Sequence, residues 1–215
     1  MVSDVCRIWF AVGRKAKQRI VGWDEAKGWI FDLLDQRGRG IVGISGPVGA
    51  GKTTLARSLG GTLISTDDYL PNYDEVPESE RDEPRHADLG LLRQHLALLR
   101  DGRTVEIPTW CFHAHRRTGY RRVVPSAPIV CEGLHALHAR IRGLLSVAVL
   151  VDAPASERWK RWEAIELRGE RGWGVERARA YFEQVAEPTF RRFAAEYRAV
   201  ADLIVLNPVP RTLGT

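Results

Sequence analysis

Cysteine is scarce in this sequence, and its few cysteines have no spacing typical of a site. The 215 residues include Cys6, Cys111 and Cys131, with no CxxC pair. An odd number of cysteines cannot all pair within one chain, and zinc ribbons need closely spaced ligand pairs. We therefore expect neither a disulfide framework nor a structural zinc site.

Long apolar runs and long runs of one charge are also missing. No segment approaches the roughly 20 apolar residues that span a bilayer. Near the N-terminus a short apolar stretch precedes basic residues, the reverse of a secretory signal. These features predict a cytoplasmic protein without a membrane partner. The formal net charge of +5 suits any anionic ligand, and the scattered basic residues do not favour nucleic acid over a nucleotide.

Short apolar segments alternate with helical ones along the chain. Strands are predicted at 41–45, 62–65, 104–107, 128–132, 146–152 and 202–206, and helices at 23–34, at 54–59, between Asp88 and Gly102, and over most of the segment between the last two strands. Nearly all-apolar strands between helices imply a parallel sheet covered on both faces, a three-layer α/β fold. We expect one domain overall, with a tail and helix in residues 1–39 before the main part, 40–215.

The segment GPVGAGKTT, residues 46–54, lies between a predicted strand and a predicted helix. It fits the pattern GxxxxGK[ST], in which glycines let backbone N–H groups wind around a phosphate at the start of a helix. Lys52 is expected to reach the β- and γ-phosphates, and the Thr53 hydroxyl to ligate Mg²⁺. The residues expected to bind ATP are Gly46, Pro47, Val48, Gly49, Ala50, Gly51, Lys52, Thr53 and Thr54.

Two neighbouring carboxylates, Asp67 and Asp68, follow the strand predicted at 62–65. The guanine-reading NKxD motif is absent and the only DxxG, at 35–38, precedes the phosphate loop, which disfavours a GTPase switch. A small-molecule kinase needs an acceptor for the hydroxyl proton close to the γ-phosphate. In extended chain, side chains alternate, so only one of the two carboxylates is expected to point inward.

Several further segments resemble, in order, the uridine kinase and phosphoribulokinase-like P-loop kinases. They are STDDY, DEPRHADLGLL, IPTWCFHAHRRTG, IVCEG, and YFEQVAEPTFRRF followed by ADLIV, and with the phosphate loop they cover about residues 40–208. The resemblance implies a P-loop NTPase fold with a mostly parallel sheet, a helical lid and a small substrate-binding hairpin. It also implies that Asp67 is the catalytic base, which leaves Asp68 as a solvated or helix-capping residue or a second working acid.

Two strands end in an acid that could serve the metal, and the sequence leaves both open. Asp152 is the cleaner match by pattern alone, whereas the resemblance favours Glu132 because the family has an acid–glycine pair at that place. Asp152 is then expected to cap the following helix.

Residues 155–172 resemble the lid helix of the family, which brings arginines to the phosphates. Its arginines are spaced by three and seven, so they would share one helical stripe: Arg158, Arg161, Arg168 and Arg171. Arg161 and Arg168 are the two expected to stabilise the transferring phosphoryl group. The alternative is a solvated face paired with Glu163, Glu166 and Glu170.

The resemblance maps acceptor contacts onto Asp82, Trp110, His115 and Arg117. Departures such as Glu83, Cys111 and Trp162 put uridine in doubt. We predict a Mg²⁺- and ATP-dependent kinase for a small-molecule hydroxyl, with uridine or cytidine first. Nicotinamide riboside, pantothenate, glycerate or a sugar are alternatives, and a regulatory ATP-binding module is the rival from another class. Relatives often associate, so a homo-oligomer is a further expectation.

Overall fold

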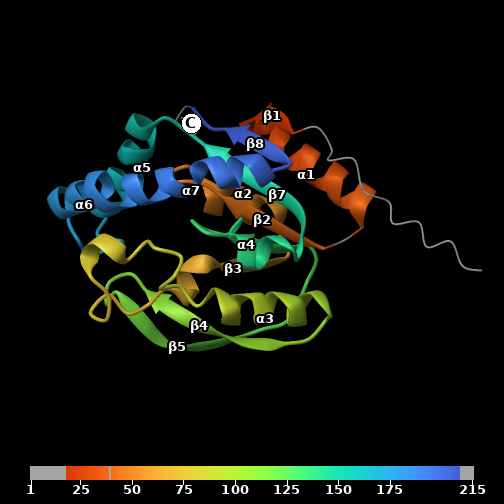
Figure 1. The fold of residues 1–215 in the computed structure, drawn as a ribbon, viewed down its shortest axis with the longest axis horizontal. Helices are drawn as coiled ribbons and strands as arrows, with labels where there is room; N and C mark the ends of the chain where they lie inside the picture. Colours follow the sequence, from red (N-terminus) through yellow and green to blue (C-terminus); the bar gives the residue numbers. More distant parts are fainter. Residues whose placement is uncertain (1–17, 39, 209–215) are drawn as a thin grey trace, which may run out of the picture.

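Six strands form one parallel sheet in the order β1-β8-β7-β2-β6-β3 (Figure 1). This computed structural model describes residues 18–38 and 40–208. The strands are β1 (Arg19–Gly22), β2 (Ile41–Ser45), β3 (Thr62–Ser65), β6 (Ile129–Glu132), β7 (Leu145–Asp152) and β8 (Leu203–Leu206). The α/β class and the parallel sheet predicted from the alternation of apolar segments are confirmed.

Helices connect these strands and cover both faces of the sheet. They are α1 (Trp23–Arg37), α2 (Lys52–Leu59), α3 (Leu89–Arg100), α4 (Ala139–Arg142), α5 (Ala155–Leu167), α6 (Val175–Tyr181) and α7 (Glu187–Val200), with short 3₁₀ turns η1 (Thr66–Tyr69) and η2 (Glu78–Glu80) and one π-helical turn, η3 (Phe182–Ala186). The Asp88 carboxylate caps α3 as predicted, because it accepts a hydrogen bond from the Leu91 N–H at 2.9 Å. None of the helices in the described part of the chain is long and apolar enough to cross a membrane.

The region expected to be a tail contributes an edge strand. Residues 19–22 pair in parallel with β8, and the helix that follows packs on the sheet through Ala26, Ile30 and Leu34. The rest of the expected tail, residues 1–17, lies outside the described residues. Strand β1 was not predicted, because its side chains are mostly exposed and only Val21 is buried, so no apolar pattern marks it.

The strand expected at 104–107 does not join the main sheet. It belongs to β4 (Val105–Cys111), which pairs antiparallel with β5 (Arg116–Val123) in a separate two-stranded sheet beside α3 (Figure 1). Apolar content alone could not separate the two outcomes, because Val105 and Ile107 are buried against α3 rather than between sheet neighbours. The small hairpin implied by the resemblance is therefore present.

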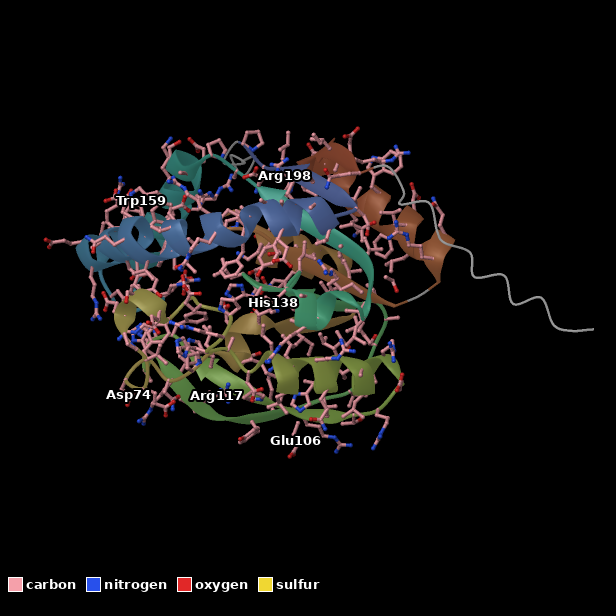
Figure 2. All side chains as sticks on the ribbon, in the orientation of Figure 1. Asp74, Glu106, Arg117, His138, Trp159 and Arg198 are labelled. Carbon is pink, nitrogen blue, oxygen red and sulfur yellow. The ribbon has the colours of Figure 1, made fainter. Side chains whose placement is uncertain are left out.

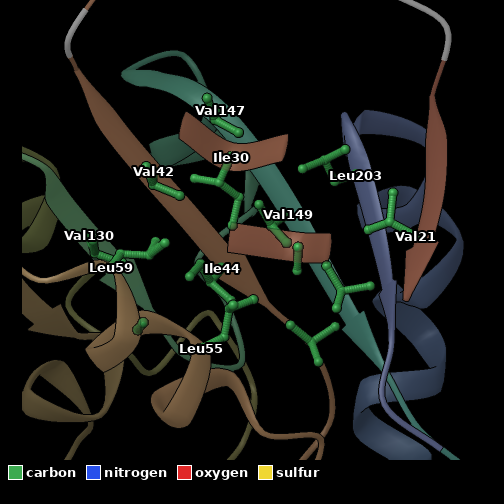
Figure 3. Close-up of a cluster of buried hydrophobic side chains, with 14 of the residues drawn as sticks. Val21, Ile30, Val42, Ile44, Leu55, Leu59, Val130, Val147, Val149 and Leu203 are labelled. Carbon is green, nitrogen blue, oxygen red and sulfur yellow. The ribbon is translucent and has the colours of Figure 1, made fainter. Parts of the chain in front are cut away.

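The core is divided by the sheet into two apolar layers. On one face, the buried residues of α1 and α2 pack against Val42, Ile44 and Val149 (Figure 3). On the other face, α7 packs against Leu150 and Ile204, and α3 with the hairpin packs against Ile41, Ile64 and Cys131. These side chains lie on this face because successive residues of a strand point to opposite sides of the sheet. Burial on both faces leaves the carboxyl ends of the strands as the natural place for a ligand.

Candidate active site

A cavity of about 670 Å³ opens at the carboxyl ends of β2, β3 and β6. Its walls come from the phosphate loop, from η1, from the loop of residues 71–88, from the hairpin, from α5 with the turn after it, and from the α6–η3 segment. The cavity therefore brings together residues up to 138 positions apart in the sequence, from Val48 to Ala186. Its volume lies within the range that is usual for small-molecule sites.

The phosphate loop has the backbone that a phosphate cradle requires. Gly49 and Gly51 have φ angles of 74° and 103°, in the region that favours glycine, and a Cβ on Gly49 would lie 2.3 Å from the Arg158 carbonyl oxygen. Helix α2 begins at Lys52, so its unpaired N–H groups face the cavity. The Lys52 ammonium donates to the Pro47 carbonyl at 3.0 Å, which holds the lysine across the loop.

The two neighbouring carboxylates separate, as the alternation argument predicted, although the backbone there is a 3₁₀ turn rather than extended chain. Asp67 lines the cavity, and its N–H donates to the Ser65 hydroxyl at 3.2 Å. Asp68 accepts hydrogen bonds from the Trp110 N–H at 3.2 Å and the Arg121 guanidinium at 3.3 Å. Asp68 thus connects the turn to the hairpin, while Asp67 faces the cavity.

Glu132, and not Asp152, lies in the cavity. Glu132 is 4% exposed at the end of β6, and hydrogen bonds from Ser65 and Thr53 act on its carboxylate. Asp152 is far more exposed and accepts a hydrogen bond from Arg198 at 3.0 Å. It does not cap α5 either, since the N-cap residue is Pro154, so the predicted capping role is wrong.

The carboxylates of Asp67 and Glu132 lie close enough for their negative charges to repel each other, which favours the binding of a cation between or beside them. Burial raises the pKa of both carboxyl groups, and proximity to Asp67 raises the pKa of Glu132 further. Lys52, whose own pKa burial lowers, offsets part of this repulsion. The Glu132 carboxylate and the Thr53 hydroxyl, which lie within hydrogen-bonding distance of each other, are oxygen ligands of the kind that Mg²⁺ prefers. The residues present therefore fit the metal that the phosphate loop implies.

The predicted stripe of four arginines is interrupted because helix α5 ends at Leu167. Only Arg158 and Arg161 lie within it. Arg158 is 5% exposed and forms a buried ion pair with Glu187 of α7, so it holds the structure rather than a phosphate. Arg161 lines the cavity and donates to the carbonyls of Gly49 and Asn207, each at 3.0 Å, which braces the back of the phosphate loop.

The two arginines after the helix differ in their surroundings. Arg168 lies at the rim of the cavity, where its side chain is 57% exposed and pairs with Glu170. Arg171 turns inward over the rings of Phe112, at 4.7 Å, and Trp162, at 5.3 Å. Its positive charge lowers the pKa of Asp67 and of Asp82, so Arg171 lies between the two ends of the site.

The alternative of a solvated helix face paired with Glu163, Glu166 and Glu170 is only partly right. Glu170 does pair with Arg168 on the surface. Glu166, in contrast, is 5% exposed and accepts hydrogen bonds from the Trp162 indole at 3.0 Å and the Trp173 N–H at 3.3 Å. Glu166 thereby fixes the turn that carries Arg171 into the cavity.

The far end of the cavity is polar around Asp82. The Tyr181 hydroxyl donates to the Asp82 carboxylate at 2.9 Å, and Tyr73 lies beside the same pair. Burial raises the pKa of Asp82 to about 6, and the negative charge of Asp67 raises it while the Tyr181 hydrogen bond lowers it. A carboxylate with two phenols can bind a diol through several hydrogen bonds.

Three aromatic rings close this end of the cavity. His115 stacks between Tyr73, at 5.3 Å, and Trp173, at 5.1 Å, and all three line the cavity. Trp110 is 7% exposed and packs behind Tyr73 at 5.1 Å, outside the lining. A flat ring could lie against this aromatic wall, defined as Tyr73, His115 and Trp173.

Arg117, the remaining predicted acceptor contact, also lies outside the cavity lining. Its guanidinium donates to the carbonyls of Tyr69, at 2.9 Å, and Leu70, at 3.0 Å, and its N–H donates to the Asn72 side chain. Figure 2 shows Arg117 on the hairpin side of the molecule, near Asp74 and away from Trp159 of α5. In this structure Arg117 connects the hairpin to η1 and to the start of the loop that carries Asp82.

Sequence reasoning missed Tyr73, Tyr181, Phe112 and Trp173 as parts of the site. Tyr73 lies in an acidic segment without periodicity, and Tyr181 lies in a helix about 100 residues later. No local pattern marks them, since only the fold brings them together. Phe112 had a signal, because it lies inside the hairpin motif beside two predicted contacts.

The sequence of this chain is similar to those of known kinases. The model of the phosphoribulokinase / uridine kinase family matches residues 73–212. A uridine kinase of Tolumonas auensis is 30% identical over 183 residues, which cover 77% of this chain and 85% of that protein. A uridine kinase of Macrococcus caseolyticus is 33% identical over 179 residues, which cover 77% and 86%.

A solved structure shares the fold. The chain matches a fructose transport system kinase of a Silicibacter species with a TM-score of 0.66 and 17% identity, over 83% of this chain and 96% of that one. At this identity the match supports the fold alone. Since the family model covers more than half of the sequence, the chain belongs to the phosphoribulokinase / uridine kinase family.

Proposed function

We propose that the protein transfers the γ-phosphoryl group of ATP to a hydroxyl of a nucleoside, with uridine or cytidine as the acceptor. The observation that carries this proposal is one cavity in which Asp67 lies between the phosphate loop and the polar end around Asp82. Relatives named uridine kinase, similar over most of their length, support the choice of acceptor.

In the proposed reaction, Lys52 and the N–H groups at the start of α2 bind the β- and γ-phosphates. Thr53 and Glu132 would hold Mg²⁺, which neutralises charge on the phosphates when it is bound. Asp67 accepts the proton of the attacking hydroxyl, because it is the cavity carboxylate that remains for this task. Arg171 then stabilises the charge of the transferring group.

The acceptor end supports a ribose and a base. Asp82 and Tyr181 would accept and donate hydrogen bonds to the ribose diol, and the aromatic wall would stack on the base. Water is excluded where Trp162 and Trp173 cover the cavity from the side of α5.

The direct test is ATP consumption with Mg²⁺ against uridine, cytidine, nicotinamide riboside, pantothenate, glycerate and common sugars. We expect a phosphorylated product from uridine or cytidine, identified by mass. If ATP binds but no acceptor in this panel is phosphorylated, the nucleoside kinase is the wrong assignment and a regulatory ATP-binding module becomes the better one.

Acceptor binding is expected to weaken in acid because of Asp82. With a pKa of about 6, the Asp82 carboxyl is ionised at pH 7.5 and becomes protonated as the pH falls below 6, when it no longer accepts two hydrogen bonds. The Kd of uridine, measured calorimetrically without ATP, should rise about tenfold between pH 7 and pH 5.

Two variants test whether Asp82 causes the pH dependence of the uridine Kd. Asp82→Asn should bind uridine weakly at every pH, with a nearly flat profile. Asp74→Asn removes an exposed carboxylate from the same loop, outside the cavity, and should keep the wild-type profile. A profile that persists in Asp82→Asn would mean that another group, such as Asp67, titrates.

A further inference from the structure

A histidine that lines neither end of the cavity connects the two. His135 lies three residues beyond Glu132 and is 2% exposed. Its Nε2 lies 2.7 Å from the Asp82 carbonyl oxygen, and its Nδ1 lies 2.8 Å from the Tyr197 hydroxyl of α7. The ring therefore connects the segment that carries Glu132 to the main chain at Asp82.

The chemistry of the partners fixes the direction of both hydrogen bonds. A carbonyl oxygen only accepts, so Nε2 carries the proton and donates it to Asp82. Burial lowers the pKa of His135 to about 4, so the ring is neutral near pH 7 and Nδ1 is an acceptor. The Tyr197 hydroxyl consequently donates to Nδ1 and selects this tautomer.

Packing holds the ring in the same orientation. The His135 ring meets Phe193 edge-on, with centroids 5.7 Å apart, and meets Tyr197 edge-on at 6.3 Å. Both aromatic residues belong to α7, which is anchored on the sheet through Tyr197. A rotation of the imidazole would break two buried hydrogen bonds, so His135 is a rigid support.

The segment that His135 supports has little regular structure of its own. Residues 71–88 contain only the short turn η2, and Asp82 follows it. The carboxylate of Asp82 is held by Tyr181, and its carbonyl is held by His135. Losing the second bond would free the main chain at Asp82 while leaving the side-chain bond to Tyr181.

We propose that His135 is a positioning residue for the acceptor, which holds the Asp82 main chain at a fixed distance from the Asp67–Glu132 pair. This inference rests on the proposed function, since it gives Asp82 the acceptor. It goes beyond that function because His135 touches neither substrate, and because nothing in the local sequence marks this histidine as part of a site.

The test compares His135→Leu, His135→Gln and a matched control. In His135→Gln, the amide can donate to the Asp82 carbonyl from nearly the same place as Nε2. The control is His95→Leu, because His95 of α3 is also buried and also bonds a tyrosine hydroxyl, that of Tyr69 at 2.8 Å, without contact to Asp82.

For His135→Leu we expect an acceptor KM at least tenfold higher with the KM for ATP unchanged. In His135→Gln the acceptor KM should return most of the way to the wild-type value. His95→Leu should lower the melting temperature to a similar extent and change the acceptor KM less than twofold. The proposal would be overturned if the acceptor KM increased equally in His135→Leu and His95→Leu. It would also be overturned if the KM values for the acceptor and for ATP increased equally in His135→Leu.

Hydrogen exchange separates this inference from the proposed function. Amides of residues 78–83 should exchange faster in His135→Leu than in wild type, and His95→Leu should leave them unchanged. If Asp82→Asn leaves the acceptor KM unaltered while His135→Leu still speeds exchange there, the acceptor assignment fails and the support by His135 stands. If exchange of residues 78–83 does not change, the support itself is refuted.

Discussion

Replacement of Asp67 by asparagine is expected to lower kcat by about 10²- to 10⁴-fold, the usual contribution of a general base. Asparagine keeps the size and the hydrogen-bonding reach of the side chain, but it cannot accept the proton of the attacking hydroxyl. Asp67 also repels the triphosphate, so nucleotide affinity should be unchanged or tighter in the variant. Steady-state rates with uridine and calorimetric titration with a non-hydrolysable ATP analogue measure the two effects separately.

Asp68→Asn is the matched control for this prediction. The two residues are neighbours and carry the same charge, but Asp68 bonds the hairpin through Trp110 and Arg121 and does not line the cavity. Its replacement should reduce kcat less than tenfold. If Asp67→Asn remained active while Asp68→Asn did not, the assignment of the base would have to be exchanged between them.

Arg171→Gln is expected to lower kcat by about 10²- to 10³-fold, at or below the lower limit of the roughly 10³- to 10⁵-fold that an arginine finger contributes in phosphoryl transfer. The guanidinium is held over Phe112 and Trp162 and acts electrostatically on both Asp67 and Asp82. Arg171→Lys keeps the charge but loses the planar fork, so its kcat should lie between those of glutamine and arginine. Single-turnover phosphorylation of uridine measures the chemical step directly.

Arg168→Gln provides the comparison, because this arginine lies at the rim and pairs with Glu170 on the surface. We expect its kcat to fall less than threefold. Melting temperatures of both variants show whether lost packing accounts for lost activity, since Arg171 contacts two rings. A large loss in Arg168→Gln with a small one in Arg171→Gln would restore the pair expected from the sequence, Arg161 and Arg168.

The sequence predicted Arg161 and Arg168 for the phosphoryl group, whereas the structure favours Arg171. The two choices differ because α5 ends before Arg168. The sequence argument continued a helical stripe from Arg158 to Arg171, but α5 ends at Leu167 and the chain turns through Gly169 and Gly172, both with positive φ. Beyond the last turn of a helix, spacing no longer determines direction. Contacts with Phe112, Trp162 and Glu166 then decide where the turn points.

Strand predictions succeeded for the short apolar segments of the main sheet and failed for its exposed edge strand and for the hairpin. Five of the six predicted strands lie in the sheet, each within one residue of its predicted ends. The edge strand β1 was missed because only Val21 is buried in it, and 104–107 was misplaced because a hairpin against α3 buries the same residue types. Periodicity reports burial, but it does not report which element provides it.

The sequence by itself determined the nucleotide end of this protein. A phosphate loop is made by consecutive residues, so its glycines, Lys52 and Thr53 are readable wherever a strand precedes them and a helix follows. The acceptor end was decided only by tertiary structure. Asp82, Tyr181 and His135 lie in three separate segments and interact through single hydrogen bonds. Such contacts leave no periodic or local trace, because they depend on how the helices pack over the sheet.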